Sequence, residues 1–375
     1  MKILQTPVRF FTAIGGVENH VYYLSEELIK LGHSVKIICA DDPSSKINNV
    51  FGIEVKRLKS WFKITNTNIT PWLPIEILKS KYDIVHTHMP TPWTSDWSIF
   101  LSKLMGKKSV ITIHNDMDKT SFLSKIITEV YLHTVFLLSL SLVDKIIIVN
   151  EEWEKSFSNT SGILKRFKDK IIFLPNGVDT NIFKPLDIPR EKNTVLFVSI
   201  LDRHHKFKGL NYLLEAIKLI KKTIPDIKLI IIGEGELKIK YKNLSKELEI
   251  SENVKFLGEK NQKELVSYYN KASIFILPSI EIEGFGIVLL EALACKTPIV
   301  ATDIVGLSNG ITKSKSGLIV KKRDKKSLVN AIEYILENKV IAKNMGENGR
   351  RLVESKYDWK SISEQVVSIY QGVIS

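Results

Sequence analysis

Short runs of β-branched residues alternate with helix-length amphipathic segments along the whole chain, and this alternation limits the possible folds more than any other feature. In the first half, the strand-like runs occupy residues 2–4, 35–40, 53–58, 83–87, 110–113, 145–149 and 171–173. In the second half, they occupy residues 195–200, 227–232, 254–257, 273–277, 299–301 and 317–320. Strands that alternate with helices pair in parallel through crossover connections. The sequence therefore predicts an α/β protein with parallel sheets.

The alternation is interrupted once. Pro175-Asn-Gly-Val-Asp179 is followed by Pro185 and Pro189, a stretch that continues neither a strand nor a helix. A chain of 375 residues also exceeds one ordinary core. We expect an N-terminal domain over residues 1–174, a linker over residues 175–190, a C-terminal domain over residues 191–355, and a helix over residues 356–375 that packs back on the N-terminal domain.

Two glycine pairs follow predicted strands, where ligands of doubly wound sheets bind. Gly15-Gly16 precedes a predicted helix over residues 17–31 and would bring backbone N–H groups close to an anion, although a plain turn explains it equally well. Gly233-Glu-Gly235 also follows a strand, but Lys238 stands where a dinucleotide fingerprint needs its third glycine. An NAD site is therefore not expected.

The net charge of +13, from 54 Lys and Arg against 41 Asp and Glu, favours anionic partners without choosing among them. Part of this charge lies between Asp202 and Lys208, directly after a predicted strand. The planar guanidinium of Arg203 and the compact charge of Lys208 suit a diphosphate, whereas a solvated basic loop is the alternative. No nucleic-acid-binding module is recognisable, so nucleic acid is not an expected partner.

The segment from Pro278 to Ala292 carries two carboxylates where a strand gives way to a helix. The helix is predicted to begin at about Phe285, with Glu283 just before it. Glu291 lies less than two turns into the helix among apolar residues, and an unpaired acid there costs several kcal/mol, so it needs a partner. That partner is either a ligand's sugar hydroxyls or a buried Arg or Lys.

The run Glu283-Gly-Phe-Gly-Ile-Val-Leu-Leu-Glu291 resembles the E-x7-E motif of the retaining family 4 glycosyltransferases. Five further segments resemble motifs of this family in the same order along the chain. They are Gly15-Gly-Val-Glu18, Asp83-Ile-Val-His-Thr-His88, Thr112-Ile-His-Asn115, Pro175-Asn-Gly-Val-Asp179 and Tyr357-Asp-Trp359. Together they extend over nearly the whole chain.

The resemblance implies a GT-B fold, in which two Rossmann-like doubly wound domains face an interdomain cleft. It implies that the second domain binds a UDP-, GDP- or ADP-sugar and that the first binds a saccharide or lipid-linked acceptor. The expected reaction is transfer of a hexose-type sugar with retention of configuration, without a metal or other cofactor, in glycan biosynthesis. The alternatives are a GT-B epimerase and a non-catalytic nucleotide-sugar-binding subunit.

The resemblance also implies roles for single residues. Glu291 would hold the ribose hydroxyls, Glu283 the hydroxyls of the donor sugar, and Lys208 the diphosphate. His114 would lie beside the transferred sugar and, with His88, bind the acceptor; Lys208, Glu283 and His114 are the expected catalytic residues. The full expected donor set is Gly16, Arg203, Lys208, Glu283, Phe285, Gly286, Ile287 and Glu291.

The second cation of the diphosphate site depends on the alignment. The family has an Arg five residues before the lysine that corresponds to Lys208, and counting back gives Arg203, whereas aligning on the preceding strand gives Ile200. We favour Arg203. The family's G-G-x-x-E segment is also only half kept, as Val305-Gly-Leu-Ser-Asn309.

A metal site is the alternative explanation of His86, His88 and His114, because an i, i+2 pair lies on one face of a strand and the third histidine follows the next strand. No carboxylate or cysteine nearby in the sequence supplies a second shell. A sugar-binding site explains the same histidines, and no metal is expected.

Cys39 and Cys295 lie in apolar runs and are expected to be buried thiols, which favours a reducing compartment. The first residues contain no secretory apolar region. The longest apolar run, residues 130–143, is shorter than the roughly 20 residues of a spanning helix and is expected to be a buried or interfacial helix. We therefore expect a cytoplasmic protein.

Peripheral membrane association is a further expectation. The segment from Lys56 to Lys63 alternates cations with bulky apolar residues, and Trp72 and Leu73 follow. Such a segment can rest on an anionic membrane surface, while an ordinary surface strand and loop is the alternative.

Overall fold

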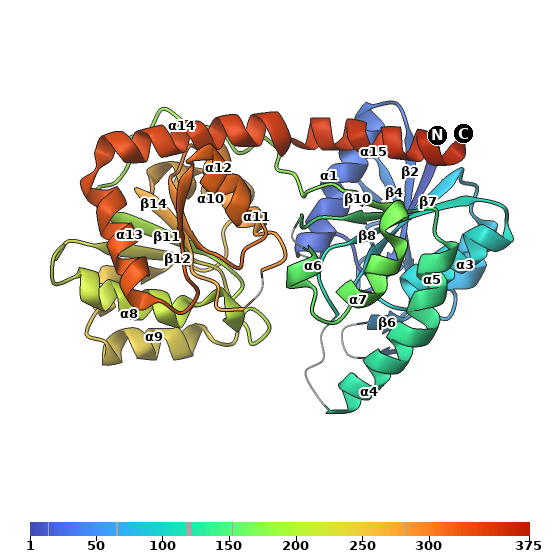
Figure 1. The fold of residues 1–375 in the computed structure, drawn as a ribbon, viewed down its shortest axis with the longest axis horizontal. Coiled ribbons are helices and arrows are strands. Elements are labelled where there is room, and N and C mark those ends of the chain that lie inside the picture. Colours follow the sequence, from blue (N-terminus) through green and yellow to red (C-terminus); the bar gives the residue numbers. More distant parts are fainter. Residues whose placement is uncertain (14, 65–66, 118–121, 152, 282) are drawn as a thin grey trace. The chain divides into compact units, whose positions relative to one another are not determined.

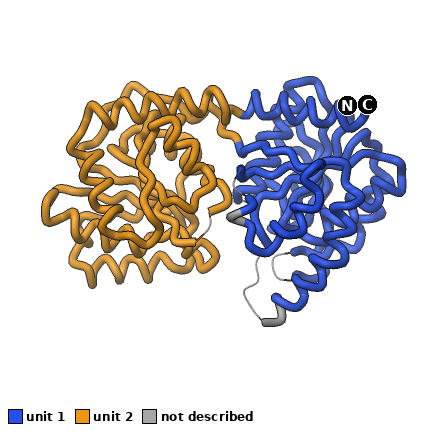
Figure 2. The backbone as a smooth tube through the Cα atoms, in the orientation of Figure 1, with its two compact units in different colours: residues 1–176, 359–375 blue, residues 177–358 orange. Residues whose placement is uncertain are grey.

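The structure is a computed structural model that describes residues 1–375 except residues 14, 65–66, 118–121, 152 and 282. It divides into unit 1, Met1–Asn176 with Trp359–Ser375, and unit 2, Gly177–Asp358 (Figure 2). Most of the stretch expected to be a linker is part of unit 2. The Val178 N–H donates to the Tyr357 carbonyl at 2.8 Å, and the Leu186 N–H donates to Asn270 Oδ1 at 2.8 Å.

Unit 1 contains an eight-stranded sheet with the order β10-β9-β8-β7-β1-β2-β4-β3 and a two-stranded β5-β6 hairpin. All neighbours in the large sheet are parallel except β3 and β4. The strands are β1 (Lys2–Thr6), β2 (Ser34–Ala40), β3 (Asn49–Val50), β4 (Ile53–Leu58), β5 (Phe62–Ile64), β6 (Thr67–Ile69), β7 (Ile84–Met89), β8 (Lys108–Ile113), β9 (Lys145–Ile148) and β10 (Ile171–Phe173). The helices are α1 (Gly16–Lys30), α2 (Leu73–Lys79), α3 (Thr94–Leu104), α4 (Phe122–Tyr131), η1 (Leu132–Phe136), α5 (Leu137–Leu142), α6 (Trp153–Ser156), α7 (Ser161–Leu164), η2 (Lys165–Lys170) and α15 (Trp359–Ile374).

Unit 2 contains a fully parallel six-stranded sheet with the order β13-β12-β11-β14-β15-β16. The strands are β11 (Thr194–Val198), β12 (Lys228–Ile232), β13 (Val254–Phe256), β14 (Ile274–Leu277), β15 (Ile299–Thr302) and β16 (Gly317–Val320). The helices are η3 (Lys206–Lys208), α8 (Leu210–Ile220), α9 (Lys238–Glu247), η4 (Ser251–Asn253), α10 (Gln262–Lys271), α11 (Ile287–Ala294), α12 (Ser308–Ser314), α13 (Lys325–Glu337) and α14 (Lys339–Lys356).

Both faces of the unit 2 sheet are buried under helices (Figure 1). Side chains of β14 alternate between two apolar clusters: Phe275 and Leu277 lie in the cluster with α10 and α11, and Ile274 and Ile276 lie in the cluster with α8 and α13. A strand buried on both faces has no polar side to place in water, which explains its continuous apolar sequence.

Helix α15 completes the core of unit 1. Trp359, Ile362, Val366 and Tyr370 are buried in the cluster that also holds Val21, Leu24 and Leu28 of α1. Tyr370 also has a polar role, because its hydroxyl lies 2.6 Å from His86 Nδ1 inside the unit.

The predicted alternation is confirmed: each of the thirteen predicted strand runs overlaps a strand, and the described part of the chain adds the short β3, β5 and β6. The helix predicted over residues 17–31 is observed as α1 (Gly16–Lys30), and it ends at a glycine cap, because the N–H groups of Gly32 and His33 donate to the carbonyls of Ile29 and Leu28. Cys39 and Cys295 are free and buried, as expected. The predicted start of α11 is wrong by two residues, since Gly286 caps a helix that begins at Ile287.

The longest apolar run forms the end of α4, the π-helical turn η1 and α5. Within the described residues one helical stretch, Lys125–Leu142, is long and apolar enough to cross a membrane by length and composition, which is weak evidence taken alone. Only 28% of that stretch is buried within the structure. A mainly buried helix is therefore the wrong expectation, whereas an interfacial helix is consistent with the exposure.

The Tyr370–His86 pair predicts a stability effect. Replacing Tyr370 by Phe leaves a buried imidazole nitrogen without its partner, which costs about 1–3 kcal/mol. We expect the Tyr370→Phe variant to unfold at a lower temperature than the wild type in a thermal melt. Tyr334→Phe, at a half-exposed tyrosine of α13, is the control and should melt like the wild type; equal melting of both variants would contradict the role of this pair.

Candidate active site

The predicted donor residues of unit 2 gather at the carboxyl ends of β11 and β14. These two strands are neighbours, and the strand order reverses between them because β12 lies on the other side of β11 and β15 on the other side of β14. Such a reversal is where doubly wound sheets bind ligands. Lys208 follows β11 in η3, and Glu283 follows β14.

Two backbone contacts join the loops that carry these residues. The Ile280 N–H donates to the Phe207 carbonyl at 2.7 Å. Gly209, directly after Lys208, has a φ of +75°, and a Cβ on it would lie 2.0 Å from the Pro278 carbonyl oxygen. Only glycine permits both this conformation and this close approach. The position of Lys208 is thus fixed by backbone packing.

Lys208 and Glu283 form a largely buried ion pair. Lys208 Nζ lies 3.3 Å from Glu283 Oε2, and the two side chains are 14% and 12% exposed. The backbone of Glu283 is held by the loop after β15, because its N–H donates to the Ile304 carbonyl at 3.3 Å and its carbonyl accepts from the Gly306 N–H at 3.1 Å. The loop that departs from the family pattern therefore supports Glu283.

Glu291 lies in the second turn of α11 and has a specific partner. Tyr269 donates its hydroxyl proton to Glu291 Oε2 at 2.7 Å. The expected alternative of a pairing with a buried Arg or Lys is wrong, because the neutral hydroxyl is the hydrogen-bond partner. Burial raises the pKa of Glu291 from 4.5 to about 7, while the Tyr269 hydrogen bond and the charge of Lys208 act in the opposite direction.

The start of α11 presents backbone donors beside these carboxylates. Gly286 caps the helix with a φ of +85°, and Phe285 is buried with its ring against Tyr357 at a centroid distance of 5.8 Å. Ile287 is partly exposed. First-turn N–H groups have no acceptor within their own helix and favour an anion. Phe285 and Gly286 can therefore meet a ligand only through their backbone.

Arg203 is not brought into the ion pair of Lys208. Its side chain is 82% exposed, and its Nε lies 2.9 Å from Glu236 Oε1. Its assignment as the second diphosphate cation stays a prediction.

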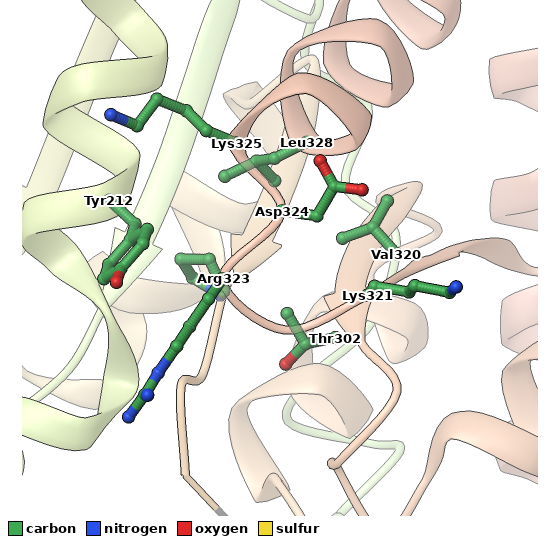
Figure 3. A pocket seen from close by; sticks show the side chains of 9 residues that line it. Tyr212, Thr302, Val320, Lys321, Arg323, Asp324, Lys325 and Leu328 are labelled. Atoms are coloured by element: carbon green, nitrogen blue, oxygen red, sulfur yellow. The ribbon is translucent and has the colours of Figure 1, made fainter.

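A pocket lies at the carboxyl ends of the next strands of the sheet (Figure 3). Thr302 ends β15, Val320 ends β16, and Arg323 and Lys325 add positive charge to its lining. None of the predicted donor residues lines this pocket.

In unit 1, Gly16 is the first residue of α1 and follows the loop after β1. Glu18 in the first turn pairs with Arg9, with Glu18 Oε1 at 3.2 Å from Arg9 Nε. The first turn of α1 therefore carries an acid that is paired with Arg9.

The predicted histidines of unit 1 are buried, and only two of the three fit one site. His88 Nδ1 lies 3.2 Å from His114 Nε2. His86 uses both ring nitrogens elsewhere, with Nδ1 at 2.6 Å from the Tyr370 hydroxyl and Nε2 at 2.7 Å from Thr112 Oγ1. The alternative metal site of His86, His88 and His114 is therefore wrong, because both ring nitrogens of His86 are hydrogen-bonded elsewhere. The histidine that lies near His88 and His114 is His20 of α1.

Comparison with known proteins agrees with this geometry. The family model for glycosyltransferase family 4 matches residues 14–182, and the model for glycosyl transferases group 1 matches residues 178–352. The two models together match most of the chain, from the α1 turn to the donor residues of unit 2. The chain belongs to the family 4 glycosyltransferases.

Two of the proteins similar to this glycosyltransferase carry phosphatidylinositol in their names. It is 24% identical to a subunit of phosphatidylinositol N-acetylglucosaminyltransferase from Arabidopsis thaliana, over 100% of this chain and 82% of that protein. It is 26% identical to phosphatidyl-myo-inositol mannosyltransferase of Mycolicibacterium smegmatis, over 97% and 92%. Anabaena Alr3699/HepE, whose crystal structure contains UDP, matches with a TM-score of 0.78 at 15% identity, over 99% and 100%. The expected GT-B fold is confirmed.

Sequence reasoning missed two side chains of this glycosyltransferase. Tyr269 lies on α10, a helix before the E-x7-E motif, and only the apolar setting of Glu291 indicates that a partner exists. His20 lies two residues after the G-G-x-E motif, and its spacing to His88 carries no signal, because α1 and β7 meet only in the folded unit. Both positions depend on tertiary packing.

The raised pKa of Glu291 predicts a pH-dependent stability difference. The folded state binds this proton more tightly than the unfolded state, so the carboxyl lowers the free energy of unfolding as the pH rises from about 4.5 to about 7. Glu291→Gln removes this loss. In thermal melts, the melting temperature of the variant relative to the wild type should therefore rise as the pH goes from about 4.5 to about 7. A difference between the two proteins that does not change with pH would contradict the raised pKa.

Proposed function

We propose that this glycosyltransferase transfers a hexose-type sugar, with retention of configuration, from a nucleoside-diphosphate sugar to a saccharide or lipid-linked acceptor. The observation that carries the proposal is the assembly of Lys208, Glu283 and Glu291 at the strand-order reversal of the unit 2 sheet. The Lys208 ammonium supplies charge for a diphosphate, and the two carboxylates supply acceptors for sugar hydroxyls. The UDP in the HepE structure supports a nucleotide donor of this class.

Each residue has a distinct part in the proposed donor complex. Glu291 accepts hydrogen bonds from the ribose hydroxyls, and Glu283 accepts them from the donor sugar. Lys208 leaves its ion pair with Glu283 in part and binds the diphosphate, together with the backbone N–H groups at Gly286 and Ile287. Gly16 and Arg203 are further donor contacts in this proposal.

The proposed reaction needs no covalent enzyme intermediate. The bond between the anomeric carbon and the diphosphate oxygen breaks, and the acceptor oxygen forms a bond on the same face of the sugar. The acceptor proton passes to the departing phosphate. Lys208 and the start of α11 stabilise the charge that develops on the leaving group, so the proposal routes no step through a metal ion.

Unit 1 is the proposed acceptor domain. His114 follows β8 at the carboxyl edge of its sheet, and we assign it a place beside the transferred sugar, with His88 behind it at 3.2 Å. The named relatives act on phosphatidylinositol-type acceptors, which supports a lipid-linked acceptor here.

Exposed apolar side chains in unit 1 support binding to an anionic membrane. Trp61 and Phe62 are 63% and 55% exposed, and Lys56 and Lys59 beside them are exposed. Leu73, in contrast, is buried and cannot contribute. A second exposed apolar surface lies on α4, η1 and α5, formed by Ile126, Ile127, Val130, Val135 and Leu138. Such surfaces bind membranes through apolar burial and attraction to acidic lipids.

The donor assignment predicts loss of transfer without loss of folding. Removing one electrostatic contact to the developing charge typically costs about 3 kcal/mol, or roughly 100-fold in rate. We expect Lys208→Ala to lose at least this much turnover when assayed with a panel of UDP-, GDP- and ADP-sugars, and Glu291→Ala to lose most of its transfer because the ribose hydroxyls lose their acceptor. The exposed neighbour Lys206 provides the matched control, Lys206→Ala, which should retain normal turnover.

The result that overturns the assignment is near-normal turnover of Lys208→Ala or Glu291→Ala. Circular dichroism and thermal melts of the same preparations separate lost catalysis from lost folding.

The membrane proposal predicts binding to acidic vesicles. We expect the wild type to co-sediment with vesicles that contain phosphatidylglycerol and far less with neutral vesicles. The double variant Trp61→Ala, Phe62→Ala should lose much of this binding, whereas Phe173→Ala, which truncates an exposed aromatic of β10, should not. Equal recovery with both vesicle types, unchanged in the double variant, is the outcome against membrane association.

A further inference from the structure

Tyr269 of α10 reaches the candidate donor site of unit 2 through its hydroxyl group. The side chain is 0% exposed, and its ring packs edge-on against Phe275 of β14, at a centroid distance of 5.5 Å, and against Phe183, at 6.1 Å. The Thr297 hydroxyl donates to the Tyr269 carbonyl at 2.7 Å. Because both the ring and the backbone are held by the core, the position of the Tyr269 hydroxyl is fixed.

This hydroxyl donates to a carboxylate. Most side-chain hydrogen bonds in proteins go to the backbone or to water. Tyr269 instead donates to Glu291 Oε2 at 2.7 Å, which is a charge-assisted hydrogen bond when Glu291 is ionised. Burial raises the pKa of Tyr269 well above its usual value of 10. The hydroxyl therefore keeps its proton and stays a donor at neutral and mildly alkaline pH.

The two oxygens of the Glu291 carboxylate have different surroundings. Oε2 accepts from the buried Tyr269, whereas Glu291 itself is partly exposed. Among the residues that the structure describes, no group other than Tyr269 donates a hydrogen bond to this carboxylate. The carboxylate thus keeps acceptor capacity on Oε1 for a hydroxyl that arrives from outside the protein.

We propose that Tyr269 is a positioning residue for donor binding: its hydroxyl holds Oε2 and keeps Glu291 ionised, so that Oε1 accepts from the ribose hydroxyls. This inference rests on the proposed function, because it requires Glu291 to bind the ribose. Tyr269 does not touch the donor and acts only through Glu291.

Glu291 needs such a hydrogen-bond donor because its surroundings favour the neutral acid. Burial raises its pKa to about 7, and the Tyr269 hydrogen bond and the charge of Lys208 oppose this rise. Lys208 is shared with Glu283, whose Oε2 lies 3.3 Å from Lys208 Nζ. A protonated Glu291 would accept hydrogen bonds from ribose hydroxyls less strongly than the carboxylate does. The charge that binds the ribose therefore depends on Tyr269.

The other titratable groups near α11 do not replace Tyr269. Cys295 is a neutral thiol, since burial raises its pKa to about 12. The guanidinium groups of two arginines lie on backbone carbonyls: Arg190 donates to Ala272 and Lys296, and Arg350 donates to Phe183 and Ala294. The described side chains that act on or surround this carboxyl are thus Tyr269, Lys208, Cys295, Arg190 and Arg350.

The test is a calorimetric titration of the full chain with UDP, GDP and ADP between about pH 6 and about pH 9. Tyr269→Phe keeps the ring but loses the hydrogen bond that lowers the pKa of Glu291. Relative to the wild type at the same pH, its affinity for the nucleotide that binds most tightly should fall roughly 3- to 10-fold near pH 7 and return to within about twofold near pH 9. Comparison at equal pH cancels the titration of the phosphates. Tyr268→Phe, at a partly exposed tyrosine of the same helix, should bind like the wild type.

Glu291→Gln separates this inference from the proposed function. It should bind the nucleotide more weakly than the wild type near pH 9, where the wild-type carboxyl is ionised. Wild-type affinity in Glu291→Gln, or a wild type that binds none of the three nucleotides, overturns the donor assignment and this inference together. If Glu291→Gln is weakened, this inference alone is overturned by a Tyr269→Phe variant that binds like the wild type or is weakened by the same factor at every pH, because a packing defect does not follow the ionisation of Glu291.

The double variant Tyr269→Phe, Glu291→Gln tests whether Tyr269 acts through Glu291. It leaves no buried carboxylate without its donor, so it should fold even if Tyr269→Phe is unstable. The double variant should bind within about twofold of Glu291→Gln at each pH, since the two residues act as one unit. A further loss of about tenfold or more contradicts the proposal. Circular dichroism of each variant at each pH verifies folding.

Discussion

The candidate donor site depends on the close approach of the β11 and β14 loops in unit 2. Because Gly209 lies against the Pro278 carbonyl and Ile280 donates to Phe207, the segment with Lys208 and the segment with Glu283 cannot move independently. The ion pair between these two side chains is a consequence of that backbone contact. Any side chain at position 209 would push the loops apart, so the charge arrangement depends on a single glycine.

The two units differ in the charge of the side chains that gather in each. The site of unit 2 combines one ammonium, two carboxylates and a helix start, an arrangement whose charges a phosphorylated sugar can satisfy. The core of unit 1 instead contains the neutral imidazoles of His20, His88 and His114, and burial lowers the pKa values of these rings. The net charge of +13 describes neither site, because most of the cations lie on the surface and, among the residues that the structure describes, Lys208 is the cation brought into the carboxylate cluster.

The sequence predicts the fold well because each element carries its own signal. Apolar runs bounded by turns predict all the main strands, and the E-x7-E spacing identifies both carboxylates without any knowledge of their contacts. Prediction fails where a partner comes from a distant element. Tyr269 reaches Glu291 from α10, and His20 reaches His88 from α1, so neither contact has a local pattern. For Arg203, prediction fails in a different way. Its position along the chain suits a diphosphate, but in the structure its side chain pairs with Glu236.

Lys208, Glu283 and Glu291 are proposed to form the site of a nucleotide-sugar donor. The most direct measurement is a crystal structure of the protein with whichever of UDP, GDP and ADP raises its melting temperature most. We expect the ribose hydroxyls to lie on the Glu291 carboxylate and a diphosphate oxygen to lie on Lys208 Nζ. A nucleotide bound elsewhere, with Glu291 bonded only to Tyr269 and Lys208 only to Glu283, would contradict it.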